Sequence, residues 1–275
     1  MENKAIRVLY GTVGGRLLVK VMLKTGMPKA VAKYLHSGLS RPLVSRYIKK
    51  YDISMDDFQE QEFRCFADFF GRKKMTTSVD PVPTHFVSPC DGWLSAYPIR
   101  PDSSFGIKRS HYQLCDLMDD PELAAQYRDG LCLIIRLSPA DYHHYSFIDD
   151  GNLGEYHYIE GTLHSVQPIA CDKYPVYRLN RRCWTVMDTA HFGPVVQVEI
   201  GALAVGEIVN ECGLSDFGRG DEKGHFELCG STIVLLVQKG QIELLPEIRS
   251  ALETAQEYRV TQGMWIASKT DEADL

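Results

Sequence analysis

The sequence of 275 residues lacks any apolar run of the roughly 18 to 20 residues that a membrane-spanning helix needs. It also lacks internal repeats and low-complexity tracts, so we expect one large globular domain or two smaller ones. The early apolar run 8–15 is short, holds three glycines and is closed by Arg16, which argues against a signal peptide. We therefore expect a cytoplasmic protein that can touch a membrane without crossing it.

The eight cysteines include no CxxC pair. Such pairs are typical of zinc sites, and a disulfide framework is typical of small secreted chains. We therefore interpret these cysteines as small hydrophobic residues in a reducing compartment. No set of histidine, cysteine and carboxylate residues has metal-ligand spacing either, so we predict no metal site.

Charge is unevenly distributed along the chain. Residues 1–50 carry eleven Lys or Arg and one acidic residue, a charge of +10, whereas the rest carries −16 of the net −6. A basic segment on an acidic body indicates an anionic partner, either nucleic acid or an anionic lipid surface. Nucleic acid is disfavoured because the basic segment contains no recognisable module.

Residues 5–36 alternate apolar positions with Arg and Lys at helical spacing. This pattern predicts one or two basic amphipathic helices that can lie in the headgroup layer of a membrane. The alternative is a helix with a solvated basic face, packed on its own domain. Residues 40–50 and 54–70 are predicted to be helical too, and Ser54 is the expected N-cap of the second helix.

The pattern changes after a polar, proline-containing linker at 71–85. From residue 85 onward, short β-branched and aromatic runs are separated by turn residues, which is typical of strands. We predict an α+β fold, in which a basic helical region at 1–75 contacts a membrane. A β-rich, sandwich-like or barrel-like catalytic domain is predicted at 76–275.

A Gly-Ser-Thr sequence precedes the apolar run Ile233 to Val237. If the Gly230–Ser231 peptide is held under strain, the Ser231 hydroxyl can attack the Gly230 carbonyl and form an ester. That reaction needs a base for the hydroxyl proton and a donor for the oxyanion. The alternative is a simple turn before a strand.

Two other short segments carry residue types that suit catalysis. VSPCDGWLS contains Asp91, which is either part of a turn or a buried carboxylate that orients a histidine. LSPADYHHYSF contains His143 and His144, which point to opposite faces if the segment is a strand. One of them can then enter a site, although a surface pair is the alternative.

Taken together and in order, these segments resemble the phosphatidylserine decarboxylase family. The resemblance rests on HFELCGSTIVLLV, similar to the family's GST cleavage segment, on SPCDG, similar to SPADG, and on SPADYHHY, similar to the DYHR segment. It extends to FADFFGRK, VQVEIGALAVGEI and the basic LYGTVGGRLL. It therefore covers nearly the whole chain.

The resemblance implies that this chain makes its own cofactor. Ser231 attacks Gly230, the ester breaks by β-elimination, and the dehydroalanine formed hydrolyses to a pyruvoyl group with release of ammonia. Residues 1–230 then form the β chain and residues 231–275 the α chain. The pyruvoyl group forms a Schiff base with the amine of phosphatidylserine and acts as an electron sink, so that CO₂ leaves and phosphatidylethanolamine is produced.

The resemblance also assigns roles to individual residues. Asp91 is the acid of an Asp-His-Ser triad for self-cleavage, and His143 protonates the substrate after CO₂ has left. Thr232 and Tyr142 support the two segments. The expected place of action is the cytoplasmic side of a membrane, with the enzyme bound peripherally, and the resemblance is compatible with a homodimer.

The chain departs from the family at the triad histidine. Relatives have a second histidine three residues after the first, and this chain has Ser146 there. A turn-rich segment separates Ser146 from His164, so a hairpin can return His164 to that place. We predict that His164 is the replacement base.

Two other functions remain open at this point. The same chemistry can act on a free amino acid, although the basic amino-terminal segment argues against it. A chain without its triad histidine can also be an uncleaved lipid-binding paralogue.

Overall fold

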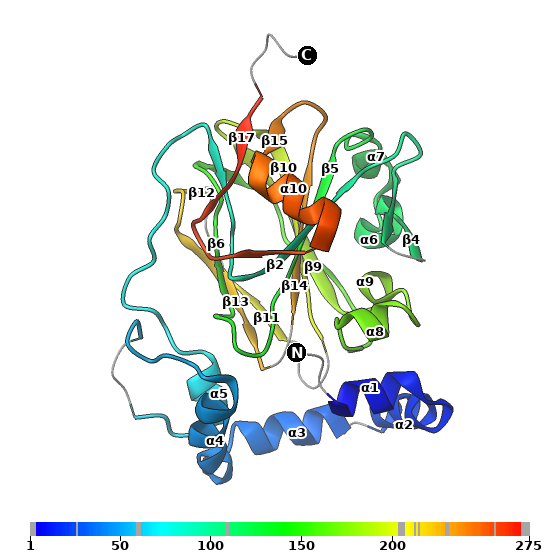
Figure 1. The fold of residues 1–275 in the computed structure, drawn as a ribbon, viewed down its shortest axis with the longest axis vertical. Coiled ribbons are helices and arrows are strands. Elements are labelled where there is room, and N and C mark those ends of the chain that lie inside the picture. The colour runs from blue at the N-terminus through cyan, green and yellow to red at the C-terminus, as the bar shows by residue number, and fades with distance from the viewer. Residues whose placement is uncertain are drawn as a thin grey trace.

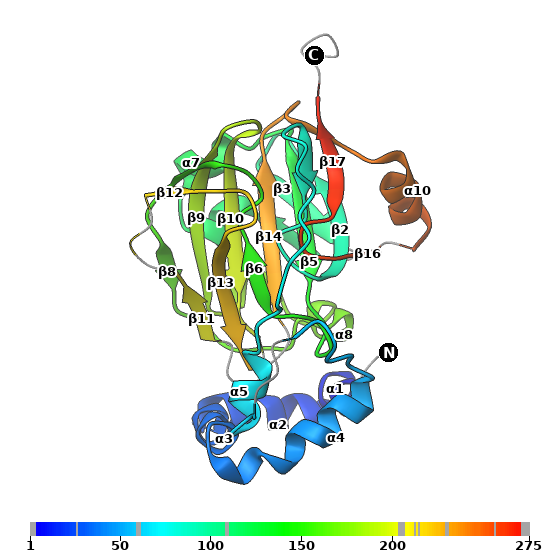
Figure 2. The same ribbon diagram turned by 90° about the vertical axis from the view of Figure 1, so that its left-hand side faces the viewer.

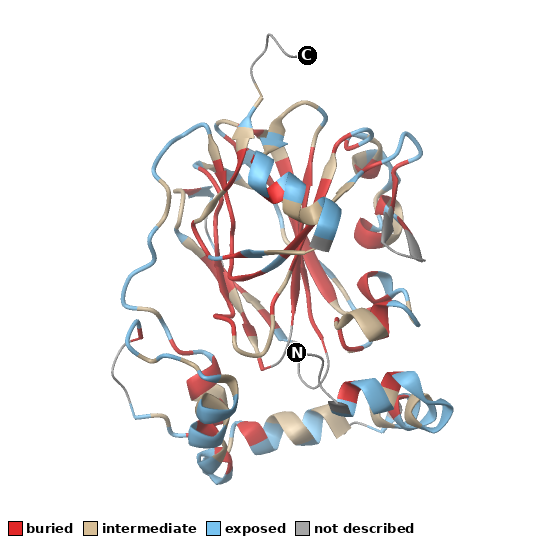
Figure 3. Cartoon of the chain, viewed as in Figure 1, coloured by how far each residue is buried: buried red, intermediate tan, exposed pale blue. Residues whose placement is uncertain are grey.

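The computed structural model describes residues 4–25, 27–58, 62–107, 110–202, 207–211, 213, 215–228, 231–255 and 257–270. Helices come first in the chain and lie together along one side of the molecule (Figures 1 and 2). They are α1 (Lys4–Gly11), α2 (Val13–Lys24), α3 (Met27–Leu35), η1 (Gly38–Ser40), α4 (Pro42–Tyr51) and α5 (Phe66–Phe70). Much of their surface is exposed (Figure 3).

The two predicted central helices have different outcomes. The helix expected at 40–50 is confirmed as α4, which begins at Pro42. The helix expected at 54–70 is wrong over most of its described length, because only α5 is helical. The Ser54 hydroxyl instead bonds the Asp56 side chain at 2.9 Å, and the Asp56 N–H bonds Ser54 Oγ at 3.3 Å. Such local bonds compete with helix formation.

A nine-stranded sheet forms the centre of the molecule. Its order is β12-β7-β9-β10-β14-β5-β2-β16, with β8 also paired to β9, and every pairing is antiparallel. The strands are β2 (Gly92–Pro98), β5 (Leu131–Arg136), β7 (Gly151–Leu153), β8 (His157–Ile159), β9 (Arg182–Thr189), β10 (Gly193–Ile200), β12 (Asp216–Phe217), β14 (Thr232–Val237) and β16 (Tyr258–Val260). All six residues of β14 are buried.

Both faces of this sheet are covered. Val234 and Leu236 of β14 belong to one core, which also contains residues of α6 (Leu114–Met118), α7 (Pro121–Ala125), α8 (Pro168–Cys171) and α9 (Val176–Leu179). Ile233, Leu235 and Val237 point into a second core. Successive strand residues face opposite sides, so the two apolar layers account for the continuous apolar run of β14.

Three smaller sheets complete the β region. Two of them face the second core: β1-β17-β15 (His85–Val87, Trp265–Lys269, Ile242–Leu244) and β11-β13-β6 (Glu207–Asn210, Glu222–Glu227, His144–Ser146). The helix α10 (Pro246–Ala255) packs on this side through Ile248. The third sheet pairs β3 (Ser104–Ile107) with β4 (Ser110–Gln113).

The predicted α+β class is confirmed, with amino-terminal helices followed by a β-rich region. The strand order of the central sheet runs from β12 to β16 without closing into a barrel within the described residues. None of the helices in the described parts of the chain is long and apolar enough to cross a membrane.

The amino-terminal helices contact the β-rich region at two places. Tyr10 of α1 is fully buried in the first core. Further along, Phe66, Phe69 and Phe70 of α5 form an aromatic core that also buries Leu228, three residues before Ser231. The helical region is thus packed directly against the segment that leads to the predicted cleavage site. The domain boundary at residue 75 stays a prediction.

Candidate active site

Ser231 lies immediately before β14, in the middle of the central sheet, and is fully buried. Its carbonyl accepts the Leu137 N–H at 2.9 Å, which extends the β14–β5 ladder by one step. The serine is therefore fixed to a strand that is hydrogen-bonded on both sides. A position beside a strand within a sheet holds a reacting residue more precisely than a loop does.

Leu228, three residues before Ser231, has a rare backbone conformation. Leu228 has a φ of 50° and is fully buried in the aromatic core of α5. A residue with a Cβ pays a steric cost in this left-handed region, and such cost is found where the surrounding packing enforces it. Gly230, the other partner in the predicted cleavage, lies outside the described residues.

Asp91 lies at the same end of the sheet as Ser231. Arg136 of β5 pairs with Thr232 on one side and with Trp93 of β2 on the other, so Ser231 and Asp91 both precede residues of one cross-strand row. Asp91 is only 8 % exposed, and its carboxylate contacts Lys74 and Gln262. It accepts the Gln262 N–H at 2.9 Å and bonds from Lys74 Nζ at 3.2 and 3.4 Å.

The position of the family's triad histidine also lies beside the Asp91 loop. Ser146, at the end of β6, donates its N–H to Pro89 O at 2.9 Å and its hydroxyl to the same oxygen at 3.4 Å. The contact shows that residue 146 is within reach of the SPCDG segment. Within the described residues, the side-chain cation that contacts Asp91 is Lys74.

His143 is fully buried between the α5 segment and the start of β6. Its ring centre lies 4.3 Å from that of Phe70, and its Nδ1–H donates to Asp141 O at 2.9 Å. Because a carbonyl can only accept, Nε2 carries the lone pair. Nε2 is buried and has no hydrogen-bond partner among the described residues.

Burial is the main reason that the pKa of His143 falls to about 4, against a weaker opposing effect of Asp141. At neutral pH the ring is therefore uncharged and presents a proton acceptor at Nε2. The loop that holds it is braced by Asp141, whose carboxylate accepts the Ser138 N–H at 2.6 Å and a bond from Arg259 Nη2 at 2.7 Å.

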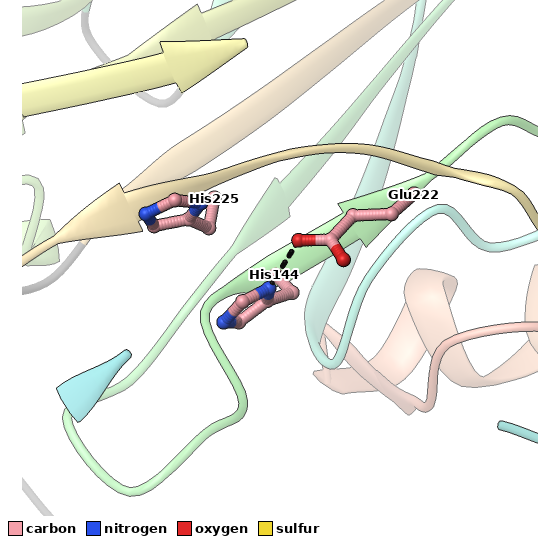
Figure 4. Close-up of side chains that lie close together, drawn as sticks. All are labelled: His144, Glu222 and His225. Carbon is pink, nitrogen blue, oxygen red and sulfur yellow. Dashed lines mark hydrogen bonds and ion pairs between the residues drawn. The ribbon is translucent and has the colours of Figure 1, made fainter. Parts of the chain in front are cut away.

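His144, Glu222 and His225 form a polar cluster between β6 and β13 (Figure 4). His144 Nδ1 lies 2.7 Å from Glu222 Oε1, and its Nε2 lies 3.3 Å from Gly71 O. The rings of His144 and His225 stack with centres 4.8 Å apart. The hydrogen bond from His144 is the main reason that the pKa of Glu222 falls to about 2.

The ligand atoms of this cluster lie within 4.8 Å of one another, so it has the composition of a metal site. Both nitrogens of His144 already face protein oxygens, Glu222 Oε1 and Gly71 O. A ring nitrogen that donates to such an oxygen has no lone pair for a metal ion. The arrangement is that of a hydrogen-bonded His–Glu pair with a second imidazole stacked on it, and the absence of a metal stays a prediction.

His164 lies in a different environment. Its Nδ1 is 3.3 Å from the Tyr10 hydroxyl, and its ring stacks on Tyr174 with centres 4.6 Å apart. Burial lowers its pKa. The expected return hairpin is wrong, because β6 pairs with β13 rather than with the segment that precedes His164. Strand pairing over this distance in sequence is decided by tertiary packing.

The backbone of His164 nevertheless reaches the end of the sheet where Ser231 lies. Asn180 Nδ2 donates to His164 O and to Gly201 O, both at 2.8 Å, and Gly201 follows Ile200, the partner of Thr232. A role of His164 as the base stays a prediction, and His164→Ala tests it.

The two supporting residues have distinct surroundings. The Tyr142 hydroxyl accepts the Lys74 N–H at 3.3 Å, and its ring stacks on His144 with centres 4.7 Å apart. Thr232 is fully buried, and its Oγ1 has no hydrogen-bond partner among the described residues.

Sequence reasoning did not find Lys74, nor the carboxylate Glu222. Lys74 lies in the basic run GRKK, which has the composition of a solvated segment, and Glu222 lies in the charged run RGDEKG. Only the fold shows that their side chains turn toward Asp91 and His144.

The fold and the site together define a class of protein. It is an α+β protein with a buried serine immediately before the central strand, a buried carboxylate at the same end of the sheet, and a buried, neutral histidine just before β6.

Comparison with known proteins is consistent with this description. The family model for phosphatidylserine decarboxylase matches residues 65–266. The chain is 37 % identical to phosphatidylserine decarboxylase proenzyme 2 of Clostridium acetobutylicum over 273 residues, which cover 98 % of this chain and 94 % of the relative. It is 37 % identical to a phosphatidylserine decarboxylase proenzyme of Desulfitobacterium hafniense over 254 residues, covering 90 % and 85 % of the two chains. The chain belongs to the phosphatidylserine decarboxylase family.

Proposed function

We propose that this chain is a proenzyme that cleaves itself between Gly230 and Ser231 and then decarboxylates phosphatidylserine to phosphatidylethanolamine. The observation that carries the proposal is the placement of Ser231. It is buried immediately before the central strand, three residues after Leu228 with its positive φ, and at the same sheet end as Asp91. Family membership supplies the substrate.

In the first reaction, the Ser231 hydroxyl attacks the Gly230 carbonyl carbon. The Gly230–Ser231 amide is replaced by an ester, and elimination across the serine Cα–Cβ bond then releases residues 1–230 with a free carboxylate. Asp91 is the acid of this step. Its carboxylate is held in position by Lys74 Nζ and by the Gln262 N–H, so it can orient and stabilise a base beside it.

Two buried polar atoms would suit the pyruvoyl group that would result. Thr232 Oγ1 and His143 Nε2 are both buried polar atoms that lack a partner among the described residues. A buried polar atom without a hydrogen bond is costly, so these two suit a site that acquires a polar group. The pyruvoyl group would supply an electron sink for the pair of electrons that CO₂ leaves behind.

His143 is the proton carrier in this proposal. Decarboxylation consumes one proton, which must reach the α-carbon of the substrate. Neutral His143 can accept a proton at Nε2 from the substrate amine and return it to that carbon. The apolar neighbours that keep the ring neutral also exclude water.

A membrane is the expected source of the substrate. The helices α1 to α3 carry basic residues and exposed apolar residues, including Val13 at 77 % and Leu17 at 64 % exposure. We propose that this surface binds an anionic bilayer peripherally on its cytoplasmic side, and that the two cleaved chains stay together. A homodimer is compatible with these features.

The first measurement is the intact mass of purified protein under denaturing conditions, for the wild type and for Ser231→Ala. The wild type should give two chains of 230 and 45 residues. The smaller chain should be lighter than a serine-headed peptide by the mass lost when ammonia is released. Ser231→Ala should stay as one chain of 31.1 kDa. An uncut, inactive wild type would contradict the proposal and favour a lipid-binding paralogue.

A further inference from the structure

Arg72 is a buried guanidinium that pairs with no carboxylate among the described residues. Only 2 % of the residue is exposed. Its head lies between the rings of Phe58 and Phe69, 4.6 Å from each ring centre. Nη1 donates to Phe69 O at 3.3 Å, and buried Nε has no partner among the described residues.

Such an arrangement is costly in the free protein. A buried charge is ordinarily paired, and an Arg has five N–H donors to satisfy. Desolvation lowers the pKa of Arg72, as expected for a cation removed from water. Aromatic faces offset part of this cost, but they cover only the two faces of the guanidinium plane. The edge of the plane, which carries the N–H groups, is the part that suits an anion.

The flanking residues show that Arg72 faces inward. Gly71 and Lys73 line a charged surface cavity, whereas the Arg72 side chain points away from it into the aromatic layer. On this inner side, Arg72 packs on Phe69, and the ring of the next residue, Phe70, lies 4.3 Å from that of His143. Two residues after Arg72, Lys74 Nζ pairs with Asp91 at 3.2 Å. The guanidinium therefore lies in the segment that contacts the groups assigned to proton transfer and self-cleavage.

We propose that Arg72 binds the phosphodiester of the phospholipid substrate through the N–H edge of its guanidinium. This inference rests on the proposed function and identifies the residue that selects a phosphate-bearing substrate over a free amino acid. A guanidinium edge matches the geometry of phosphate oxygens and binds them through charge-assisted hydrogen bonds.

The substrate also carries a carboxylate, and the chemistry argues against that group as the partner. The carboxylate charge disappears as CO₂ forms, so a guanidinium on it would stabilise the ground state and slow the reaction. The phosphodiester keeps its charge throughout. A contact with it contributes equally to the ground state and the transition state, which lowers KM without changing kcat.

The test compares wild type with Arg72→Met, using dihexanoyl phosphatidylserine as a dispersed substrate and dihexanoyl phosphatidylethanolamine as an inhibitor. The inhibitor has the phosphodiester and lacks the carboxylate. We expect Arg72→Met to raise both KM and the inhibition constant about tenfold, with kcat changed less than about twofold. Its melting temperature should not fall, since an unpaired buried cation is removed.

Two further variants make the outcomes decisive. Arg64→Met removes an exposed guanidinium of the same segment, paired with Asp68, and should leave both constants unchanged. Arg72→Lys keeps the charge but loses the planar, two-pronged donor geometry, so it should raise KM and the inhibition constant by less than Arg72→Met does. The same increase in both constants tests the proposal if Arg72→Met fails to fold.

Other results would overturn the inference. A raised KM with an unchanged inhibition constant would assign Arg72 to the carboxylate, and no change in either would remove it from substrate binding. A wild type that phosphatidylethanolamine does not inhibit would also oppose it, because the product retains the phosphodiester. Wild-type protein without activity on phosphatidylserine would instead refute the proposed function.

Discussion

At the scale of single residues, three consecutive cations after α5 have three different surroundings. Arg72 lies between two phenyl rings, Lys73 Nζ pairs with Glu222 at 2.8 Å, and Lys74 Nζ pairs with Asp91 at 3.2 Å. Lys73 is 55 % exposed at its side chain, whereas Lys74 is only 19 % exposed. Ion pairs gain strength as water is excluded, so the inner pair matters more than the outer one.

The two adjacent lysines allow a matched experiment. Lys74→Ala should slow self-cleavage at least about fivefold, because Asp91 then loses the cation that holds its carboxylate in place. Lys73→Ala removes the same charge one residue away and should slow it less than about twofold. Conversion of the single chain to two chains is followed on denaturing gels. Equal rates for both variants would mean that Lys74 has no special part in the reaction.

These residues also show which parts of the candidate site could be predicted from the sequence. Ser231, Asp91 and His143 were predicted as site residues because each lies in a short segment whose residue types suit one reaction. Arg72 and Lys74 were not predicted, because a run of cations is ordinarily a solvated surface and side-chain direction depends on packing. Direct neighbours in sequence give no sign of which cation turns inward.

At the scale of elements, β6 and β13 bring polar groups together that lie 78 residues apart in sequence. The class of the fold followed from local patterns, and so did the existence of α4. The pairing of β6 with β13 did not, since any of several strands could accept β6. The predicted hairpin to His164 failed for this reason, and the helix expected from Ser54 failed because side-chain bonds formed a turn.

The β6–β13 pair should make stability depend on pH. Burial is the main reason that the pKa of His225 falls to about 4, from an ordinary value of 6.5. As pH falls below 6.5, the unfolded chain takes up a proton at this histidine while the folded chain does not. The contribution of His225 to the free energy of unfolding is therefore fully present above pH 6.5 and is lost as pH falls toward 4. Glu222, with a pKa of about 2, acts in the same direction below its ordinary value of 4.5.

His225→Phe keeps an aromatic ring against His144 and removes this titration. Both proteins are compared in a Ser231→Ala background, which keeps one chain. When pH falls from 7 to 4.5, the protein with His225 should lose about 2 kcal/mol more free energy of unfolding than the protein with His225→Phe. Urea unfolding at several pH values measures the difference. Parallel curves for the two proteins would show that His225 is protonated alike in the folded and unfolded chains.

At the scale of the whole molecule, the amino-terminal helices combine two functions. They hold Leu228 and Arg72 in place through the aromatic core of α5, and they present apolar and basic residues outward. A lipid bound through the helices α1 to α3 would meet the same side of the molecule on which α5 adjoins the start of β14. The proposed membrane-contact surface and the candidate site thus lie toward the same side of the molecule (Figure 2).

This arrangement predicts binding to anionic vesicles with two separable contributions. Raising the salt concentration from 50 to 500 mM should weaken binding at least about tenfold, because screening shortens the reach of the lysines and arginines. The double variant Val13→Ser, Leu17→Ser should weaken binding at both salt concentrations, since it removes apolar area that enters the headgroup boundary. Val82→Ser changes an exposed apolar residue of the segment before β1 and should have no effect. Vesicle sedimentation measures the binding of the wild type and of both variants at each salt concentration.

Two outcomes would contradict this prediction. Binding that is independent of salt would rule out the electrostatic contribution, and equal effects of the double variant and Val82→Ser would remove α2 from the contact surface.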